Sequence, residues 1–389
     1  MRIGIVTLVS DNYGNKYQNY AVEQLLSEHA QVITYRVEAK PGNAKTSTAS
    51  GIYKFRPSHI TEALRCRMMY LYDVTNMERS VFGNVIYVLT HKKKLLSAKQ
   101  KRSEKFKSFE KSYLHISDRV ISHENCMEKD WTEAHDFFVC GSDQIWNPAY
   151  GTISDLAFLS FAEGKSVALA PSFGVSSVPK EERDKFRKWI NGIDTLSVRE
   201  DAGARIITDL TGREAQVLLD PTMAICAEHW SGMAKKPQAK LPEKYILTYF
   251  LGRMTKTYKN RIQRLSHMTG LPVVNLFDIE RPEYYIFDPN EVLFAINNAS
   301  LVLTDSFHGT VFSILFRRDF SVFVRDEGGE SMHSRLTTLL GKLGLKDRMD
   351  DGEALTEQIP IEKWNEVHRI IESERQKTKS YIDKAVRGE

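Results

Sequence analysis

The residues best suited to chemistry lie in short polar segments that directly follow runs of apolar residues. His308 and Gly309 come after residues 301–303 (LVL) and before an apolar segment that begins at Thr310. A histidine can carry a proton near neutral pH, and a helix that begins here would present unpaired N–H groups and the positive end of its dipole. The segment therefore indicates an anion site, although His308 as a turn cap and Gly309 as a purely conformational requirement fit the same residues.

A second candidate is Arg199, which directly follows the predicted strand 195–198. Its rigid guanidinium can hold a carboxylate or a phosphate with two parallel hydrogen bonds. A structural salt bridge to Glu200 or Asp220 explains the same residue. Both interpretations stay open at this point.

Asp143, Gln144 and Trp146 form a third polar segment, GSDQIWN, after the apolar residues 136–140. The face of a tryptophan stacks on the C–H groups of sugars, while neighbouring amides and carboxylates bond sugar hydroxyls. The segment is therefore typical of a sugar-binding surface. A tryptophan that only anchors a loop is the alternative.

Asn15 and Asn19 belong to a segment rich in amides and phenols, residues 12–20 (NYGNKYQNY). Such groups bond sugars or phosphates, but asparagine also favours turns and helix caps for local reasons. The segment follows a predicted strand at 2–9 and begins a helix with apolar residues at helical spacing, and a second strand follows at 32–37. This β–α–β order indicates a parallel sheet.

The same alternation continues through both halves of the chain and predicts an α/β protein with two Rossmann-like domains. Because ligands bind at the carboxyl ends of parallel strands, the four polar segments are expected to face one site. The predicted organisation is a first domain at 1–223 with a helical insertion at about 60–113, a second domain at 224–352, and a C-terminal helix within 353–389 that packs back on the first domain. The further predicted strands are 166–170, 216–219, 245–250, 272–276 and 320–324.

Composition excludes several classes of protein. The chain has 389 residues, 42% of them hydrophobic, and a net charge of only +4, which does not indicate nucleic acid as a partner. The four cysteines are scattered without a C-x-x-C pair, so neither a zinc site nor a disulfide framework is predicted. Neither a signal peptide nor a run of about 20 apolar residues is apparent, and a cytoplasmic protein is expected.

One stretch, residues 91–111, carries nine Lys or Arg against two Glu, with Leu95 and Leu96 beside Lys92, Lys93 and Lys94. A basic amphipathic helix of this kind can lie on an anionic membrane. The alternative is a solvated helix face. Peripheral contact with the inner leaflet of the cytoplasmic membrane is therefore an expectation to be tested.

Five motifs in order, NYGNKYQNYA, GSDQIWN, SVRED, LDPT and TDSFHGTVFSILF, closely resemble the polysaccharide pyruvyl transferase family over residues 1–345. The resemblance implies a GT-B-like fold, in which two Rossmann-like domains face a cleft and a C-terminal helix crosses back. It also implies transfer of the enolpyruvyl unit of phosphoenolpyruvate to a sugar, generally as a cyclic ketal on a bacterial surface polysaccharide or its lipid-linked precursor. Phosphoenolpyruvate is then a co-substrate, and neither a cofactor nor a metal is expected.

The resemblance also implies roles for particular residues. Arg199 and His308 match the strand-end arginine and the helix-start histidine of the family. Ser306 stands where many members have an arginine, so Arg325, Arg335 or His333 is expected to compensate. The predicted catalytic residues are His308, Arg199 and Asp143; the predicted phosphoenolpyruvate-binding residues are Arg199, Ser306, His308, Gly309, Thr310 and Arg335; and the predicted acceptor-binding residues are Asn15, Asn19, Gln144 and Trp146.

Two other functions fit the same pattern. A GT-B glycosyltransferase would share the fold and a basic pocket for a nucleotide sugar. A catalytically silent sugar- or phosphate-binding relative would keep the cleft, and Ser306 in place of an arginine favours it.

Overall fold

The structure is a computed structural model. It describes residues 1–38, 81–150, 153–162, 164, 166–252, 254–325, 333–349 and 358–388. The first part of the predicted helical insertion, residues 60–80, lies outside the described residues. The rest of that insertion is one long helix, α3 (Val81–Tyr113).

The first domain is built on a five-stranded parallel sheet in the order β3-β2-β1-β4-β5. A bridge between Val167 and Thr195 continues this sheet toward the two-stranded sheet β6-β7, which gives the strand order of a dinucleotide-binding fold. The strands are β1 (Arg2–Val6), β2 (Gln31–Val37), β3 (Ile116–Ile121), β4 (Phe137–Cys140), β5 (Ser166–Ala168), β6 (Ser197–Val198) and β7 (Gln216–Val217).

Particular residues mark the start of one helix and the end of another in the first domain. Helix α1 begins with Asn12 as N-cap, whose side chain accepts a hydrogen bond from the N–H of Gly14. Helix α6 ends at Gly212 in the left-handed conformation. The helices are α1 (Tyr13–Ser27), α4 (Lys129–Thr132), α5 (Arg183–Asn191) and α6 (Asp201–Thr211).

The second domain has a four-stranded parallel sheet in the order β11-β10-β8-β9. Its strands are β8 (Ile246–Tyr249), β9 (Val273–Asn275), β10 (Leu301–Thr304) and β11 (Phe320–Val322), and its helices are α9 (Lys256–Thr269), α10 (Pro282–Tyr285), α11 (Pro289–Asn297), α12 (Phe307–Leu315) and α13 (His333–Lys342). Asp288 and Glu291 form a capping box that starts α11. Two short helices, α7 (Pro221–Ala224) and α8 (Ala227–Met233), lie at and just after the domain limit predicted at residue 223.

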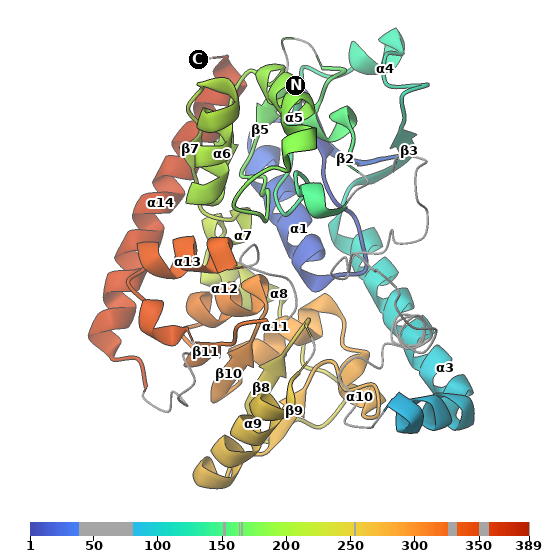
Figure 1. The fold of residues 1–389 in the computed structure, drawn as a ribbon, viewed down its shortest axis with the longest axis vertical. Coiled ribbons are helices and arrows are strands. Elements are labelled where there is room, and N and C mark those ends of the chain that lie inside the picture. Colours follow the sequence, from blue (N-terminus) through green and yellow to red (C-terminus); the bar gives the residue numbers. More distant parts are fainter. Residues whose placement is uncertain are drawn as a thin grey trace.

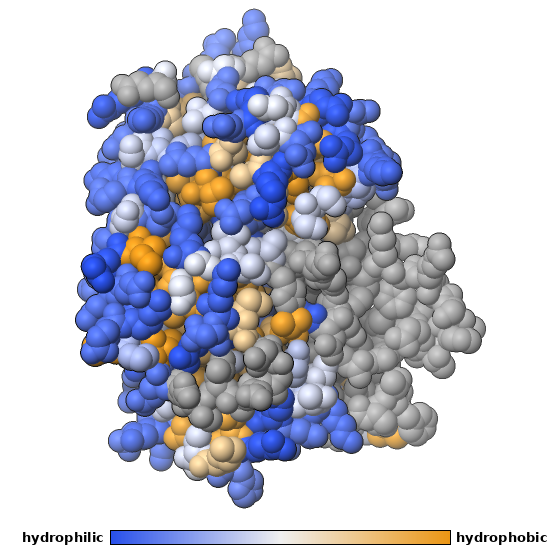
Figure 2. Space-filling view, turned by 60° about the vertical axis from the view of Figure 1, so that its left-hand side comes forward, coloured by the Kyte–Doolittle hydropathy of each residue, from blue (hydrophilic) through white to orange (hydrophobic). Residues whose placement is uncertain are grey.

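Helix α14 (Ile361–Arg387) runs along one side of both domains (Figure 1). Trp364, Val367 and Ile371 pack in the core of the second domain, whereas Tyr381 and Ile382 pack against the sheet of the first. The Tyr381 hydroxyl donates a hydrogen bond of 2.7 Å to the carbonyl of Ala168. The predicted crossing helix is therefore confirmed. Seen from the α14 side, the surface is mostly hydrophilic, with hydrophobic residues in small patches (Figure 2).

The two domains are joined through α1, whose first turns are buried on nearly every side. The Tyr13 hydroxyl donates to the carbonyl of Phe287, and the Tyr17 hydroxyl to that of Pro289, both at 2.7 Å. These buried phenols keep hydrogen-bond partners while their rings bury a large apolar area. The start of α1 is thus held against the second domain.

The predicted α/β fold with two Rossmann-like domains is confirmed, and the differences are local. Strand β1 ends at Val6 rather than at residue 9. Strand β3 was not predicted, because half of its sequence ISDRVI is polar and only Ile121 is buried. The predicted domain limits at 223 and 352 stay predictions. Among the described residues, no helix combines the length and hydrophobicity that crossing a membrane requires.

Candidate active site

Strand ends from both domains bring five charged or titratable side chains together. Asp143 follows β4, Arg199 follows β6 and Asp220 follows β7, whereas His308 lies in the first turn of α12 and Arg335 in α13. All five are buried, with at most 9% of any residue exposed. We call this set the buried charge cluster. Asp143, Arg199, His308 and Arg335 were among the predicted site residues, whereas Asp220 was not.

Arg199 is the centre of the cluster. One end of its guanidinium pairs with Asp220, and the other lies 2.8 Å from Oδ1 of Asp143. The plane of the guanidinium stacks on the ring of Phe307, 4.7 Å from its centroid. The salt-bridge interpretation of Arg199 therefore describes the structure, and the fork is occupied by two carboxylates of the protein.

The positive charge of Arg199 favours the ionised forms of Asp143 and Asp220. Burial is the largest influence and would raise the pKa of Asp143 and of Asp220, but Arg199, the next largest, together with the other favourable charges and hydrogen bonds, holds both pKa values below the ordinary value. Glu200 differs, because burial dominates and raises its pKa. Two ionised carboxylates thus lie beside His308.

His308 presents an unpaired nitrogen to this environment. Its Nε2 is buried, lies 3.8 Å from Oδ2 of Asp220 and makes no hydrogen bond within the described part of the chain. Burial lowers the pKa of His308, although Asp220 and Asp143 oppose this effect. The neutral imidazole is therefore favoured, and its Nε2 is available to a ligand or a proton.

Of the two arginines expected to compensate for Ser306, Arg335 is the one that reaches the cluster. Its Nη1 lies 3.8 Å from Oδ1 of Asp143, and its guanidinium also lies over the ring of Phe307. Burial, followed by repulsion from Arg199, lowers the pKa of Arg335 to about 10. Arg325 instead binds Asp305, with Nε at 2.8 Å from Oδ2. The side chain of His333 lies outside the described residues.

Asp143 also connects the cluster to the loop before α1. Its backbone adopts a left-handed conformation with φ of 65°, which non-glycine residues rarely hold outside constrained sites. The amide of Asn15 donates to Asp143 and accepts a hydrogen bond from Ser10. Of the predicted acceptor-binding residues, Asn15 is therefore the one that touches the cluster.

The side chains of the other three acceptor-side residues are engaged by other parts of the protein. Asn19 is buried and donates to the carbonyl of Leu8, and Gln144 accepts a hydrogen bond from Asn147. Trp146 is fully buried, and its ring stacks on Phe158 with centroids 4.8 Å apart. The prediction that Trp146 is a stacking platform for a sugar is wrong, because both faces of a core tryptophan are occupied by protein. The loop-anchor interpretation describes it.

The start of α12 is more occupied than expected. Ser306 is the N-cap and accepts from the N–H of Gly309 at 3.3 Å, while Thr310 donates its hydroxyl to the carbonyl of Ser306. A Cβ on Gly309 would lie 2.5 Å from Oγ1 of Thr304, so Gly309 serves the packing of α12 on β10 rather than the approach of a ligand. The N–H groups of Phe307 and His308 make no hydrogen bond within the described residues and remain for an anion.

Sequence reasoning missed several residues around the cluster. Asp220 appeared only as a possible partner of Arg199, although the LDPT motif marks it as a strand-end acid. Phe307 was placed in the polar turn before the helix predicted from Thr310, and no role was assigned to it. Tyr150 lies in the same field, because burial, followed by the charge of Asp143, raises its pKa to about 12. Spacing along the chain gives no sign of Tyr150.

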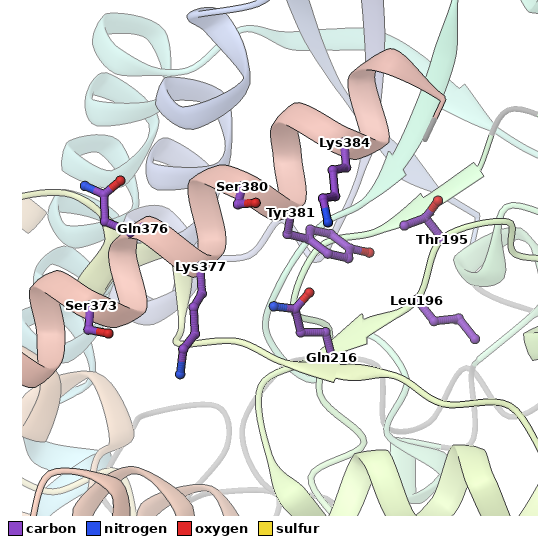
Figure 3. Close-up of a pocket in the computed structure, with 9 residues that line it drawn as sticks. All are labelled: Thr195, Leu196, Gln216, Ser373, Gln376, Lys377, Ser380, Tyr381 and Lys384. Carbon is purple, nitrogen blue, oxygen red and sulfur yellow. The ribbon is translucent and has the colours of Figure 1, made fainter.

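A groove of about 590 Å³ lies apart from the cluster, between α14 and the β6-β7 edge (Figure 3). Its lining includes Gln216, Lys377, Tyr381 and Lys384, and none of the predicted site residues. Lys377 is exposed and pairs with Glu374. The groove is a surface feature of the crossing helix rather than the candidate active site.

Gly14 offers a direct test of how His308 is positioned. A Cβ on Gly14 would clash with Nδ1 of His308 and lie 2.7 Å from its Cε1. We expect Gly14→Ala to displace the imidazole, to lower the free energy of unfolding by about 1–3 kcal/mol, and to reduce any activity that depends on His308. Urea denaturation and turnover measure the two effects.

The matched control is Gly232→Ala in α8, where a Cβ would meet nothing within 4 Å. This change is expected to be neutral or to stabilise by about 0.4–1 kcal/mol. The cost of Gly14→Ala should also disappear in a His308→Ala background, because the clashing ring is then absent. An equal cost in both backgrounds would show that Gly14 does not act through His308.

The lowered pKa of His308 predicts a pH dependence of stability. When the folded pKa lies below the ordinary 6.5, the stabilising contribution is complete above that value and is lost as the pH falls through the folded pKa. We expect the difference in unfolding free energy between the wild type and His308→Asn to fall as the pH decreases from 7 to 5. Urea denaturation at several pH values measures it, and a constant difference would contradict the prediction.

Topology and site together define a two-domain α/β protein of the GT-B type with a buried charge cluster between its domains. A family model described as polysaccharide pyruvyl transferase matches residues 12–327, and the chain belongs to this family. A search of curated proteins finds no significant match.

The solved structures that align with this chain are only distantly related in sequence, and their TM-scores are low. A putative UDP-N-acetylglucosamine 2-epimerase from Listeria monocytogenes aligns over 99% of this chain and 91% of its own, with 10% identity and a TM-score of 0.44. A glycotransferase of kitacinnamycin aligns over 99% and 98%, with 12% identity and a TM-score of 0.45. The E. coli ADP-heptose LPS heptosyltransferase II aligns over 96% and 99%, with 10% identity and a TM-score of 0.33.

Proposed function

We propose that this protein transfers the enolpyruvyl unit of phosphoenolpyruvate to two hydroxyls of one sugar and forms a cyclic pyruvate ketal. The observation that carries the proposal is the neutral, unpaired Nε2 of His308 between ionised carboxylates and arginines, in a chain of the pyruvyl transferase family. The reaction needs a proton donor, a proton acceptor and cations within one site.

The chemistry sets these requirements. A proton added to the methylene carbon of phosphoenolpyruvate makes the central carbon oxocarbenium-like, and a sugar hydroxyl attacks it with loss of its own proton. Phosphate then leaves, and the second hydroxyl closes the ring and loses a proton. One proton is consumed and two are released, and the departing phosphate takes up the difference.

His308 is the proposed proton donor. An anionic donor bound next to Nε2 raises the pKa of His308, because a negative charge favours the imidazolium. The imidazole then takes up a proton with the donor and delivers it to the methylene carbon. Positioned acid–base groups of this kind contribute roughly 10²–10⁴-fold to the rate.

The remaining groups divide between donor and acceptor. Arg335 and the N–H groups of Phe307 and His308 hold the anionic groups of phosphoenolpyruvate. Asp143, beside Asn15, takes the proton from the attacking hydroxyl. Arg199 orients Asp143 and Asp220, because its fork is already occupied by them, and this replaces the predicted grip on the donor carboxylate.

The test incubates the protein with phosphoenolpyruvate and candidate lipid-linked glycans. We expect release of phosphate together with an increase in the mass of the glycan that corresponds to one pyruvate ketal. Activity with a nucleoside-diphosphate sugar and none with phosphoenolpyruvate would instead identify a glycosyltransferase. Binding of phosphoenolpyruvate without a product from any glycan would identify a silent relative.

A further inference from the structure

The first half of α3 exposes large apolar side chains to solvent. Ile86 is 49% exposed, Leu89 73% and Leu96 45%, although residues of this kind are usually buried. Their spacing of three and seven residues places them along one side of the helix. We call these three residues the apolar stripe.

The opposite side of the same helix explains why the stripe is not simply a poorly packed core. Tyr87, Val88, Leu95 and Ala98 are buried and pack with Ile279 and Tyr285 of the second domain. This arrangement corrects the expectation that Leu95 and Leu96 share one exposed surface, because Leu95 is fully buried. One side of the helix is thus packed against the second domain, and the apolar stripe on the other side faces solvent.

Along the helix itself, the charged residues beside the stripe all have one sign. Residues 86–103 contain no Asp or Glu, and Lys92, Lys93 and Lys94 are all exposed. Lys93 lies four residues after Leu89 and is therefore its neighbour on the helix surface. An apolar stripe flanked by lysines complements a surface that is anionic outside and apolar within.

We propose that the apolar stripe and Lys92–Lys94 bind the anionic surface of a lipid bilayer, with α3 lying along it. A second copy of the chain fits less well, because a two-fold contact would place the same lysines against each other. A lipid bilayer accepts both features, since its headgroups attract lysine and its interface accommodates leucine and isoleucine.

The position of α3 connects this surface to the candidate active site. The Ser103 hydroxyl donates a hydrogen bond of 2.9 Å to the carboxylate of Asp11, which lies in the loop that leads to Asn15. Leu89 lies 14 residues earlier on the helix, about 20 Å away at 1.5 Å per residue. This inference deepens the proposed function and rests on it. A sugar attached to a lipid carrier would reach the loop that leads to Asn15 close to the membrane surface.

The experiment measures co-sedimentation of the full chain with vesicles and needs no turnover, so its failure would leave the proposed transfer reaction untouched. The wild type is expected to bind vesicles that contain phosphatidylglycerol and to dissociate from them as the salt concentration rises. It is not expected to bind vesicles of phosphatidylcholine alone. Changing Lys92, Lys93 and Lys94 together to Glu should lower the partition coefficient by at least roughly 100-fold. Leu89→Glu should lower it about tenfold or more.

Matched controls separate this surface from charge and hydrophobicity in general. Changing the exposed Lys180, Lys185 and Lys188 to Glu alters the net charge equally, and Met268→Glu removes an apolar side chain that is 67% exposed on α9. Both controls should retain binding. A wild type that stays in the supernatant at low salt, equal binding to both kinds of vesicle, or unchanged binding by the triple-lysine variant would each overturn the proposal.

Discussion

Replacing His308 by alanine is expected to lower pyruvyl transfer by roughly 10²–10⁴-fold, the usual contribution of a positioned acid–base group. The imidazole is buried, and its Nε2 makes no hydrogen bond in the described part of the chain. Removing the imidazole therefore leaves no hydrogen-bonding group of the protein without its partner. Activity should fall strongly, whereas the melting temperature should change little. Phosphate release from phosphoenolpyruvate and the melting temperature measure the two effects.

His135 provides the matched control. It is also a buried histidine, but it bonds the carbonyl of Trp131 and the hydroxyl of Tyr35 in the first domain, away from the buried charge cluster. His135→Ala should lower stability and leave the turnover of the folded protein nearly unchanged. Added imidazole should partly restore His308→Ala if the missing group is a proton carrier. Near-normal turnover of His308→Ala would remove His308 from the mechanism.

The fold was largely predictable because its signals are local. Strands such as β4 (Phe137–Cys140) and most of β10 (Leu301–Thr304) are continuous apolar runs, and helices begin at caps such as Asn12 and Ser306. Strand β3 escaped prediction because an edge strand buries little and its apolar pattern is weak. Strands β6 and β7 were predicted too long, because apolar residues beyond them, such as Leu218 and Leu219, are buried without extending the ladder.

The location of the site could be predicted from the sequence, but only part of its side-chain contacts could. Asp143, Arg199 and His308 end adjacent strands or begin the next helix, so topology alone brings them together. Which carboxylates fill the fork of Arg199 depends on side-chain packing that spacing does not specify. Trp146 shows the same limit, because a tryptophan after a strand is equally compatible with a ligand surface and with a core until its neighbours are known.

Gly14 illustrates what sequence could not indicate at all. A glycine in the segment NYGNKYQNY reads as part of a turn, whereas the structure places it in α1 against the ring of His308, almost three hundred residues later. Contacts between domains depend on how the two sheets face each other. Local patterns carry no information about that relation.

Arg199→Lys is expected to impair both stability and transfer, even though it keeps the charge. A lysine presents a single ammonium and cannot bridge Asp143 and Asp220 as a guanidinium does. Loss of one partner from a buried ion pair destabilises by about 3–5 kcal/mol, because the other charge stays buried without compensation. A surface pair provides the control: Lys185→Met, which removes a contact with Glu182, should change stability by at most about 1 kcal/mol.

The pH dependence identifies the cause of the loss. In the wild type, Arg199 holds the pKa values of Asp143 and Asp220 low, so this contribution is present above the ordinary carboxyl pKa and is lost as the pH falls through the lowered values. In the variant, burial raises both pKa values, and protonation then relieves the unpaired charge. The stability difference between wild type and Arg199→Lys should therefore shrink as the pH falls from 7 toward 4, as urea denaturation would show.

A second substitution tests the same cause without changing pH. Asp220→Asn removes the buried charge that Arg199 neutralises, so it should recover part of the stability lost in Arg199→Met, whereas alone it should destabilise. Recovery of stability without recovery of transfer would assign Arg199 to positioning, because Asp143 would still lack its orienting partner. Independent, additive losses would instead mean that the contact between Arg199 and Asp220 contributes little, and that the buried charge cluster is held by other packing.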